Sequence, residues 1–146
     1  MKLSKQDYMK YCGEHQPKSN LLWDTVRAFL FGGVICVIGQ AFLMWYTALG
    51  LTADGAGGAT SATLITLSAL LTGFGVYDDI AKYAGAGTLV PITGFANSVA
   101  SAALEFKSEG YVLGMCAKMF TLAGPVIVFG LTASVVYGFV YWFCAM

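Results

Sequence analysis

The chain has 146 residues, of which 58% are hydrophobic and only 11% charged, and its formal net charge is zero. Its mean hydropathy is +0.70, and a chain this short has too much surface to bury several apolar helices in a soluble domain. We therefore expect an integral membrane protein, and the neutral charge gives no support to nucleic-acid binding.

Residues 1–27 are predicted to form a polar arm on the cytoplasmic side of the membrane. The arm is too polar for the apolar core of a cleavable signal peptide. A short amphipathic helix is expected at about Ser4–Glu14, and another helix after Asn20, whose side chain can cap it. Five of the eight basic residues precede the first long uncharged run, whereas the next connection, near Thr52–Gly58, holds only Asp54. The positive-inside rule therefore places the N-terminus on the cytoplasmic side.

Residues 28–146 are predicted to form one transmembrane domain. A helix needs about 20 apolar residues to cross a hydrocarbon core of about 30 Å. Four uncharged runs reach this length: Ala28–Ala53, Gly55–Tyr77, Tyr83–Leu104 and Met119–Met146. The fold class is therefore predicted to be all-α, a polytopic helical membrane protein with about four transmembrane helices. Residues 111–123 fit a half-span, an interfacial helix or the first part of a long final helix.

The first two predicted spans look regular. The first runs from about Arg27 to Gly50, and Trp45 and Tyr46 close it with aromatic side chains at the far interface. The second covers about Ala59–Tyr77 and carries several Ser and Thr hydroxyls. Such hydroxyls usually bond to their own helix or to a neighbouring one, so we expect most of them to serve packing.

Charged residues beyond the arm are few, and each has two interpretations. Asp78 and Asp79, with Lys82, follow the second span; the acids could form a pore mouth for cations, or simply be solvated. Lys118 lies within the apolar run 111–120. Its ammonium could reach the interface along its aliphatic stem, or supply an intramembrane positive charge to an anion.

The third span is predicted to be broken. Pro91 favours the first turn of a helix and disfavours helical geometry in the residue before it, so we expect Gly85–Val90 to be non-helical, with Gly94 adding to the break. A second break is expected at Gly124 and Pro125, which would kink or break the last span. Paired interrupted helices are typical of transport pathways, and a simple kink is the alternative.

A polar stripe follows the predicted break. Thr93, Asn97, Ser101 and Glu105 recur every fourth residue and can share one helix face. One interpretation is a hydrophilic lane that lines a pore or binds a solute. The other is that Asn97 bonds a neighbouring helix and Glu105 lies among the lipid headgroups.

Metal, cofactor and enzyme functions have little support. The four cysteines are irregularly spaced and the one histidine, His15, lies in the arm, so no metal site or cofactor is expected. The predicted spans lack a convergent nucleophile, base or metal set, so we do not expect an enzyme.

The broken segment carries a family resemblance. The block Pro91–Glu105, with Gly85–Val90 before it and Lys107–Gly114 and Phe120–Gly130 after it, resembles the core of the stage V sporulation protein A membrane subunits. The AC and AEb types of this family share the core. The N-terminal arm, the segment Phe31–Gln40 and the length are more similar to the AC type.

The resemblance implies a function. It implies a subunit of an oligomeric channel in the spore inner membrane, which moves dipicolinic acid with calcium into the forespore during sporulation and out during germination. It also implies tension-sensitive gating, an AEb-type membrane partner and a soluble AD-type partner. The residues themselves suggest that the dianion is held at the helix start near Pro91 and Thr93, assisted by Asn97 and Lys118. The alternatives are a non-conducting scaffold that docks a soluble partner, and a secondary transporter.

Overall fold

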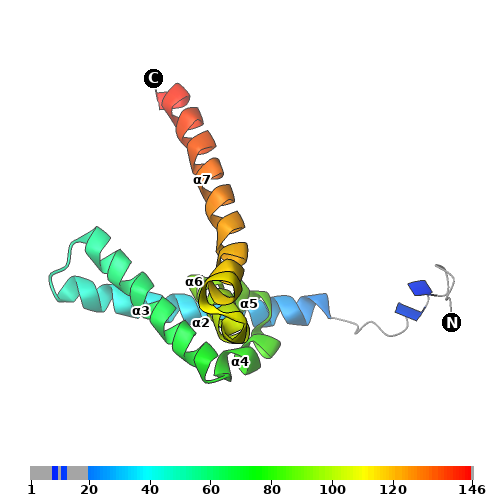
Figure 1. The fold of residues 1–146 in the computed structure, drawn as a ribbon. Coiled ribbons are helices and arrows are strands. Elements are labelled where there is room, and N and C mark those ends of the chain that lie inside the picture. The colour runs from blue at the N-terminus through cyan, green and yellow to red at the C-terminus, as the bar shows by residue number, and fades with distance from the viewer. Residues whose placement is uncertain (1–7, 10, 13–19, 146) are drawn as a thin grey trace.

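The computed structural model describes residues 8–9, 11–12 and 20–145, which are helical with short turns and contain no strand (Figure 1). Within these described residues, two helical segments are long and apolar enough to cross a membrane, Leu21–Ala48 and Tyr111–Ala145. A third crossing is possible if Ala53–Gly73 and Val76–Ala84, which are bent by 105° relative to each other, together form one broken span. The chain is therefore an all-α membrane protein, as predicted.

The first two helices form a hairpin. α2 (Leu21–Ala48) begins directly after Asn20, as expected, but the Asn20 side chain makes no capping hydrogen bond. α3 (Ala53–Gly73) begins after Thr52, whose side chain accepts a hydrogen bond from the backbone N–H of Gly55 at 3.3 Å. Of the amphipathic helix predicted at Ser4–Glu14, residues 8–9 and 11–12 are helical, and the rest lies outside the described residues.

A sharp turn separates α3 from the short helix α4 (Val76–Ala84). Gly75 adopts a left-handed backbone conformation, with φ of 72°. A residue with a side chain would be strained in this conformation. α4 is amphipathic: Tyr77 and Ala84 are buried, while its charged residues are exposed. The turn redirects α4 toward the N-terminal part of α2, against which it packs (Figure 1).

The predicted break in the third span is present, with one correction. Gly85, with φ of 52°, ends α4, and the extended backbone of Pro91 precedes α6 (Ile92–Glu105). The expectation that Gly85–Val90 is non-helical was wrong, because residues 86–89 form the single helical turn α5 (Ala86–Leu89). Gly94 lies inside the first turn of α6, where it permits close approach to the backbone of α5 rather than breaking the helix.

The last span is continuous through its proline. A 3₁₀ turn, η1 (Phe106–Glu109), and a π-helical turn, η2 (Tyr111–Cys116), lead directly into α7 (Ala117–Ala145). Of the two alternatives predicted at Gly124 and Pro125, a kink or a break, the break is excluded, because Pro125 lies within α7. Of the three interpretations of residues 111–123, the first part of a long final helix is the one observed.

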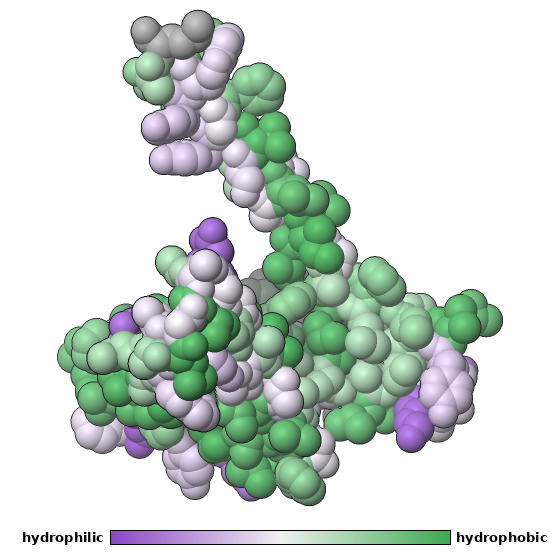
Figure 2. Space-filling model, turned by 90° about the vertical axis from the view of Figure 1, so that its left-hand side faces the viewer, coloured by the Kyte–Doolittle hydropathy of each residue, from purple (hydrophilic) through white to green (hydrophobic). Residues whose placement is uncertain are grey.

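α7 extends away from the other helices (Figures 1 and 2). It packs mainly against α6 and η2 at its base, and none of its residues is buried. Figure 1 shows α6 nearly end-on, so α6 crosses both α2 and α7 steeply. The count of four spans is not confirmed, because the 14 residues of α6 reach only about 21 Å at roughly 1.5 Å per residue.

Candidate functional site

Hydroxyl and amide side chains from four helices meet where the chain breaks before α6. We call this set the break cluster. Its members are Ser68 and Thr72 from α3, Tyr77 from α4, Thr88 from α5, and Thr93 and Asn97 from α6.

Tyr77 connects the segments on both sides of the break. Its hydroxyl donates to the carbonyl oxygen of Thr88 at 2.9 Å and lies 3.2 Å from Oγ1 of Thr93. The sharp turn at Gly75 and the break at Pro91 bring these residues together. Tyr77 is only 5% exposed and Thr88 1%, so these hydrogen bonds are shielded from solvent.

Two further contacts attach α6 to α3. The Ser68 hydroxyl donates to the backbone carbonyl of Thr93 at 2.6 Å, and the Thr72 hydroxyl lies 2.7 Å from Oδ1 of Asn97. Ser68 and Thr72 are four residues apart on α3, and Thr93 and Asn97 are four residues apart on α6. Residues with this spacing lie on one face of a helix, so the two contacts join one face of α3 to one face of α6. The hydrogen bonds therefore fix the register of α6 against α3.

The break cluster is hydrogen-bonded within itself. Among the described residues, no buried side-chain nitrogen or oxygen lacks a partner. The cluster contains hydroxyls and an amide but no carboxylate or ammonium group. It can therefore donate and accept hydrogen bonds, but it carries no formal charge. In this conformation the polar groups of the break are used internally, and none of those that are buried is free for a solute.

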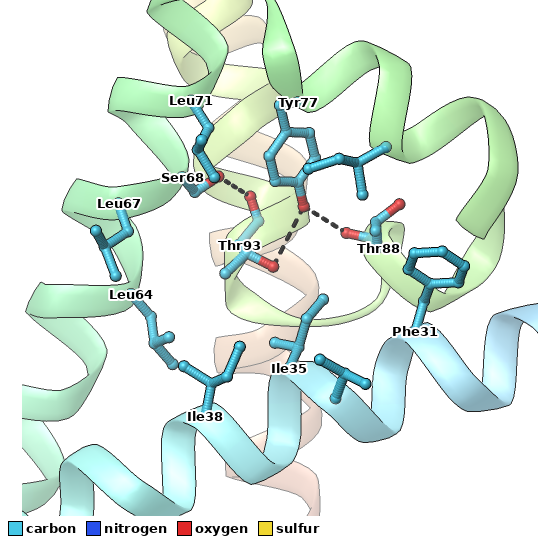
Figure 3. Close-up of a pocket in the computed structure, with 12 residues that line it drawn as sticks. Phe31, Ile35, Ile38, Leu64, Leu67, Ser68, Leu71, Tyr77, Thr88 and Thr93 are labelled. Carbon is cyan, nitrogen blue, oxygen red and sulfur yellow. Dashed lines mark hydrogen bonds between the residues drawn. The ribbon is translucent and has the colours of Figure 1, made fainter.

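An apolar cavity of about 320 Å³ lies beside the cluster (Figure 3). Four residues of the cluster, Ser68, Tyr77, Thr88 and Thr93, contribute to its lining. Their hydroxyls are hydrogen-bonded and not free in the cavity: the Thr88 hydroxyl donates to the carbonyl oxygen of Gly85 at 3.1 Å, and the others are bonded as described above. The other lining side chains are aliphatic or aromatic: Phe31, Val34, Ile35, Ile38, Leu64, Leu67, Leu71 and Ile80. Water in such a cavity would find few partners, so the cavity is suited to hydrocarbon.

The predicted polar stripe is divided between two environments. Thr93 is buried and Asn97 half-buried, and both face α3, as the alternative interpretation of Asn97 expected. Ser101 and Glu105 are exposed, and the Ser101 hydroxyl donates to the carbonyl of Ser98 at 3.1 Å. Within one copy of the chain, the four side chains do not line a common open surface.

The predicted charged sites lie apart from the cluster. Asp78, Asp79 and Lys82 are exposed on α4, and Lys82 Nζ forms an ion pair with Asp79 Oδ1 at 2.8 Å. The Lys118 ammonium lies 4.6 Å from the centre of the Phe106 ring, directed back toward the polar turn at η1.

Sequence reasoning missed the central residue of the cluster. Tyr77 was given no role beyond marking the end of the second predicted span, and Thr88 lay in a segment expected to be non-helical. The available signal was the pair Gly73 and Gly75 around Phe74, since closely spaced glycines favour a turn and a turn there points Tyr77 inward. The hydroxyls of α3 were expected to serve packing, and Ser68 and Thr72 do so.

The described residues offer no evident metal site. In residues 8–9, 11–12 and 20–145, no three His, Cys, Asp or Glu side chains are grouped so that they could hold an ion. Cys12, Cys36, Cys116 and Cys144 are all free thiols.

Comparisons with known proteins agree on one family. Residues 24–140 match the model of the SpoVAC/SpoVAEB sporulation membrane protein family. The chain is 53% identical over 137 residues to stage V sporulation protein AC of Bacillus subtilis (strain 168), an alignment that covers 93% of this chain and 91% of that protein. No solved structure matches the chain.

Proposed function

The chain belongs to the SpoVAC/SpoVAEB family of sporulation membrane proteins, and on this basis we propose that it is a channel subunit for dipicolinic acid and calcium. The channel would lie in the spore inner membrane and act in uptake during sporulation and in release during germination. The observation that carries the proposal beyond membership is the break cluster, a helix start at Pro91 surrounded by polar groups inside an apolar protein.

The free-energy cost of non-helical backbone inside a membrane supports a functional role for the break. Non-helical backbone at membrane depth is tolerated where protein covers it or where it faces water. Here Tyr77 and Ser68 cover the backbone carbonyls of Thr88 and Thr93, on either side of the break. An unbroken apolar helix would need no such cover, so the broken one is best explained by a state in which the break opens.

The conformation described here fits the closed state in this proposal. Opening would separate α6 from α3 at the contacts Ser68–Thr93 and Thr72–Asn97, and water would replace the lost hydrogen bonds. Interhelical hydrogen bonds in membranes average about 0.6 kcal/mol, with a maximum of about 1.7. A few such contacts are weak enough for membrane tension to break them, which is consistent with tension gating.

In the open state, the polar stripe of Thr93, Asn97, Ser101 and Glu105 would form a lane. The amide groups at the start of α6 would attract the dianion, because a helix N-terminus carries partial positive charge. Lys118 lies over Phe106 in the closed state and would have to move to assist. The exposed acids Asp78 and Asp79 on α4 would attract the calcium that accompanies the dianion.

Partners and topology complete the proposal. The exposed apolar surface of α7 and the exposed Ser101 and Glu105 leave room for an AEb-type membrane subunit and for an oligomeric pore. The soluble AD-type subunit would bind on the side of the N-terminal arm, which we place in the spore core.

One observation favours a different role. Because Thr93 and Asn97 are bonded to α3 rather than open to a conduit, the chain could be a non-conducting scaffold for the soluble subunit.

Reconstitution distinguishes the two roles. Purified chain would be inserted with an AEb-type subunit into vesicles loaded with dipicolinic acid and calcium, and released dipicolinic acid measured after an osmotic downshift. Release well above that of protein-free vesicles supports the channel. The soluble AD-type subunit is then added to the same vesicles. Release equal to that of protein-free vesicles, with insertion of the chain verified and the soluble subunit bound to it, supports the scaffold.

A further inference from the structure

A second pocket lies away from the break cluster, where α4 and α5 meet the N-terminal part of α2. Its volume is about 560 Å³. Its lining combines charged, polar and apolar residues: Leu21, Asp24, Thr25, Arg27, Ala28, Lys82, Tyr83, Ala84, Gly85 and Ala86.

Arg27 has unused donors in this pocket. Its guanidinium carbon lies 5.3 Å from the centre of the Trp23 ring, which covers one face of the group. In the described part of the chain, no hydrogen bond or ion pair engages the guanidinium N–H groups, although Arg27 is half-buried. A guanidinium carries five N–H donors in a planar fork, and the uncovered edge is suited to two oxygens of one anion.

Lys82 supplies a second cation from a segment distant in sequence. One of its three donors is engaged with Asp79, in a pair whose side chains are 70% and 72% exposed. The pocket lining also holds one acid, Asp24, and Lys82 is already paired with Asp79, so Arg27 is the cation of the pocket that no described carboxylate pairs with. The unpaired guanidinium favours an anionic group beside Arg27, and the two remaining donors of Lys82 can add hydrogen bonds to it.

The depth and walls of the pocket indicate the kind of anion. Arg27 directly precedes the uncharged run that crosses the membrane, and Trp23 is one turn before it, so the pocket lies at headgroup level. Leu21, Ala28 and Tyr83 contribute apolar surface beside the cations. A free anion in water gains nothing from apolar walls, whereas a lipid phosphate has hydrocarbon attached.

We propose that this pocket binds the phosphate of a membrane phospholipid, with Arg27 as a bidentate donor and Lys82 as a second cation. The bound lipid would join α2 to α4 and α5 at the membrane surface. This site is independent of the channel role, because a scaffold could hold a lipid there equally well.

The test uses Trp23 as a reporter of the pocket. The full chain carrying Trp45→Phe and Trp142→Phe would be purified in a detergent without phosphate and titrated with short-chain phosphatidylglycerol. Both Arg27→Gln and Lys82→Gln are expected to weaken binding, the first by about tenfold or more, since hydrogen bonds to charged groups contribute about 1.5–3 kcal/mol. Arg27→Lys should fall between Arg27→Gln and the unsubstituted protein.

Lys107→Gln is the matched control, because Lys107 is exposed on η1 and does not line the pocket. Native mass spectrometry of retained lipid gives a readout independent of fluorescence, and circular dichroism verifies that each variant is folded. Equal lipid affinity in Arg27→Gln, Lys82→Gln and Lys107→Gln would overturn the site. Displacement of the lipid by millimolar inorganic phosphate would overturn its assignment to a lipid.

Discussion

The Tyr77 hydroxyl lies 3.2 Å from Oγ1 of Thr93, although the two residues are 16 positions apart and stand on different helices. The same hydroxyl donates to the carbonyl of Thr88 on the short turn between them. One side chain therefore holds α4, α5 and α6 together at the break.

Removing this hydroxyl should loosen the break. Tyr77→Phe leaves the Thr88 carbonyl without its Tyr77 donor in a buried position, so we expect a loss of about 1–3 kcal/mol in the free energy of unfolding. Tyr83→Phe, at an exposed position on the same helix, should change it by less than about 0.5 kcal/mol. Unfolding of both variants in mixed micelles gives the comparison, and equal stabilities would refute the role of Tyr77.

The contact between Thr72 and Asn97 can be measured by a double-mutant cycle. Thr72→Val and Asn97→Leu, singly and together, should give a coupling energy of about 0.5–1.7 kcal/mol for the interhelical bond. Thr66 is the control, because its hydroxyl donates to the carbonyl of Ala62 in its own helix. Thr66→Val paired with Asn97→Leu should show no coupling, and a similar coupling in both cycles would argue against the contact.

Gly87 is predicted to tolerate no side chain. A Cβ at this position would collide with the backbone of Ala28, where α5 crosses α2. Gly87→Ala should therefore separate the two helices and cost more than about 1 kcal/mol through overpacking. Gly33→Ala, where a Cβ meets open space, should preserve or raise stability, since alanine favours helix. Thermal unfolding in micelles tests the pair, and a Gly87→Ala protein as stable as Gly33→Ala would contradict the packing.

Pro125 should not be needed for the shape of α7. The helix is continuous through this residue, and proline inside a helix typically costs about 3 kcal/mol. Pro125→Ala is therefore expected to raise helix stability and to leave membrane insertion unchanged, which circular dichroism during thermal unfolding and protease accessibility can measure. A loss of helical content in the variant would show that the proline has a structural role.

Much of the fold could be predicted from local sequence signals. The apolar runs predicted α2, α3 and α7, and Pro91 predicted the start of α6. Both predictions were possible because hydropathy and proline geometry determine structure over short stretches of sequence. At Gly124 and Pro125 the local pattern predicts a kink or a break without deciding between them, and α7 runs through both residues without a break.

The candidate site was predictable only in part. The recurrence of Thr93 and Asn97 placed both on one face of α6, but their partners depend on the 105° bend between α3 and α4. That bend arises from a left-handed glycine at Gly75, and it determines that Tyr77 points inward. Sequence periodicity carries no information about which helix will lie across such a turn.

The central claim, that the chain forms part of a channel whose opening separates α6 from α3, is tested most directly by a reversible crosslink. In a chain with its four native cysteines replaced by alanine, Thr72→Cys and Asn97→Cys would place two thiols at the contact between the helices. The matched controls carry Thr72→Cys alone or Asn97→Cys alone, so that oxidation has no second thiol on the other helix to join. In the vesicle assay, we predict that oxidation abolishes dipicolinic acid release in the first protein alone and that reduction restores it. Undiminished release with the Thr72–Asn97 crosslink verified in place would contradict the account.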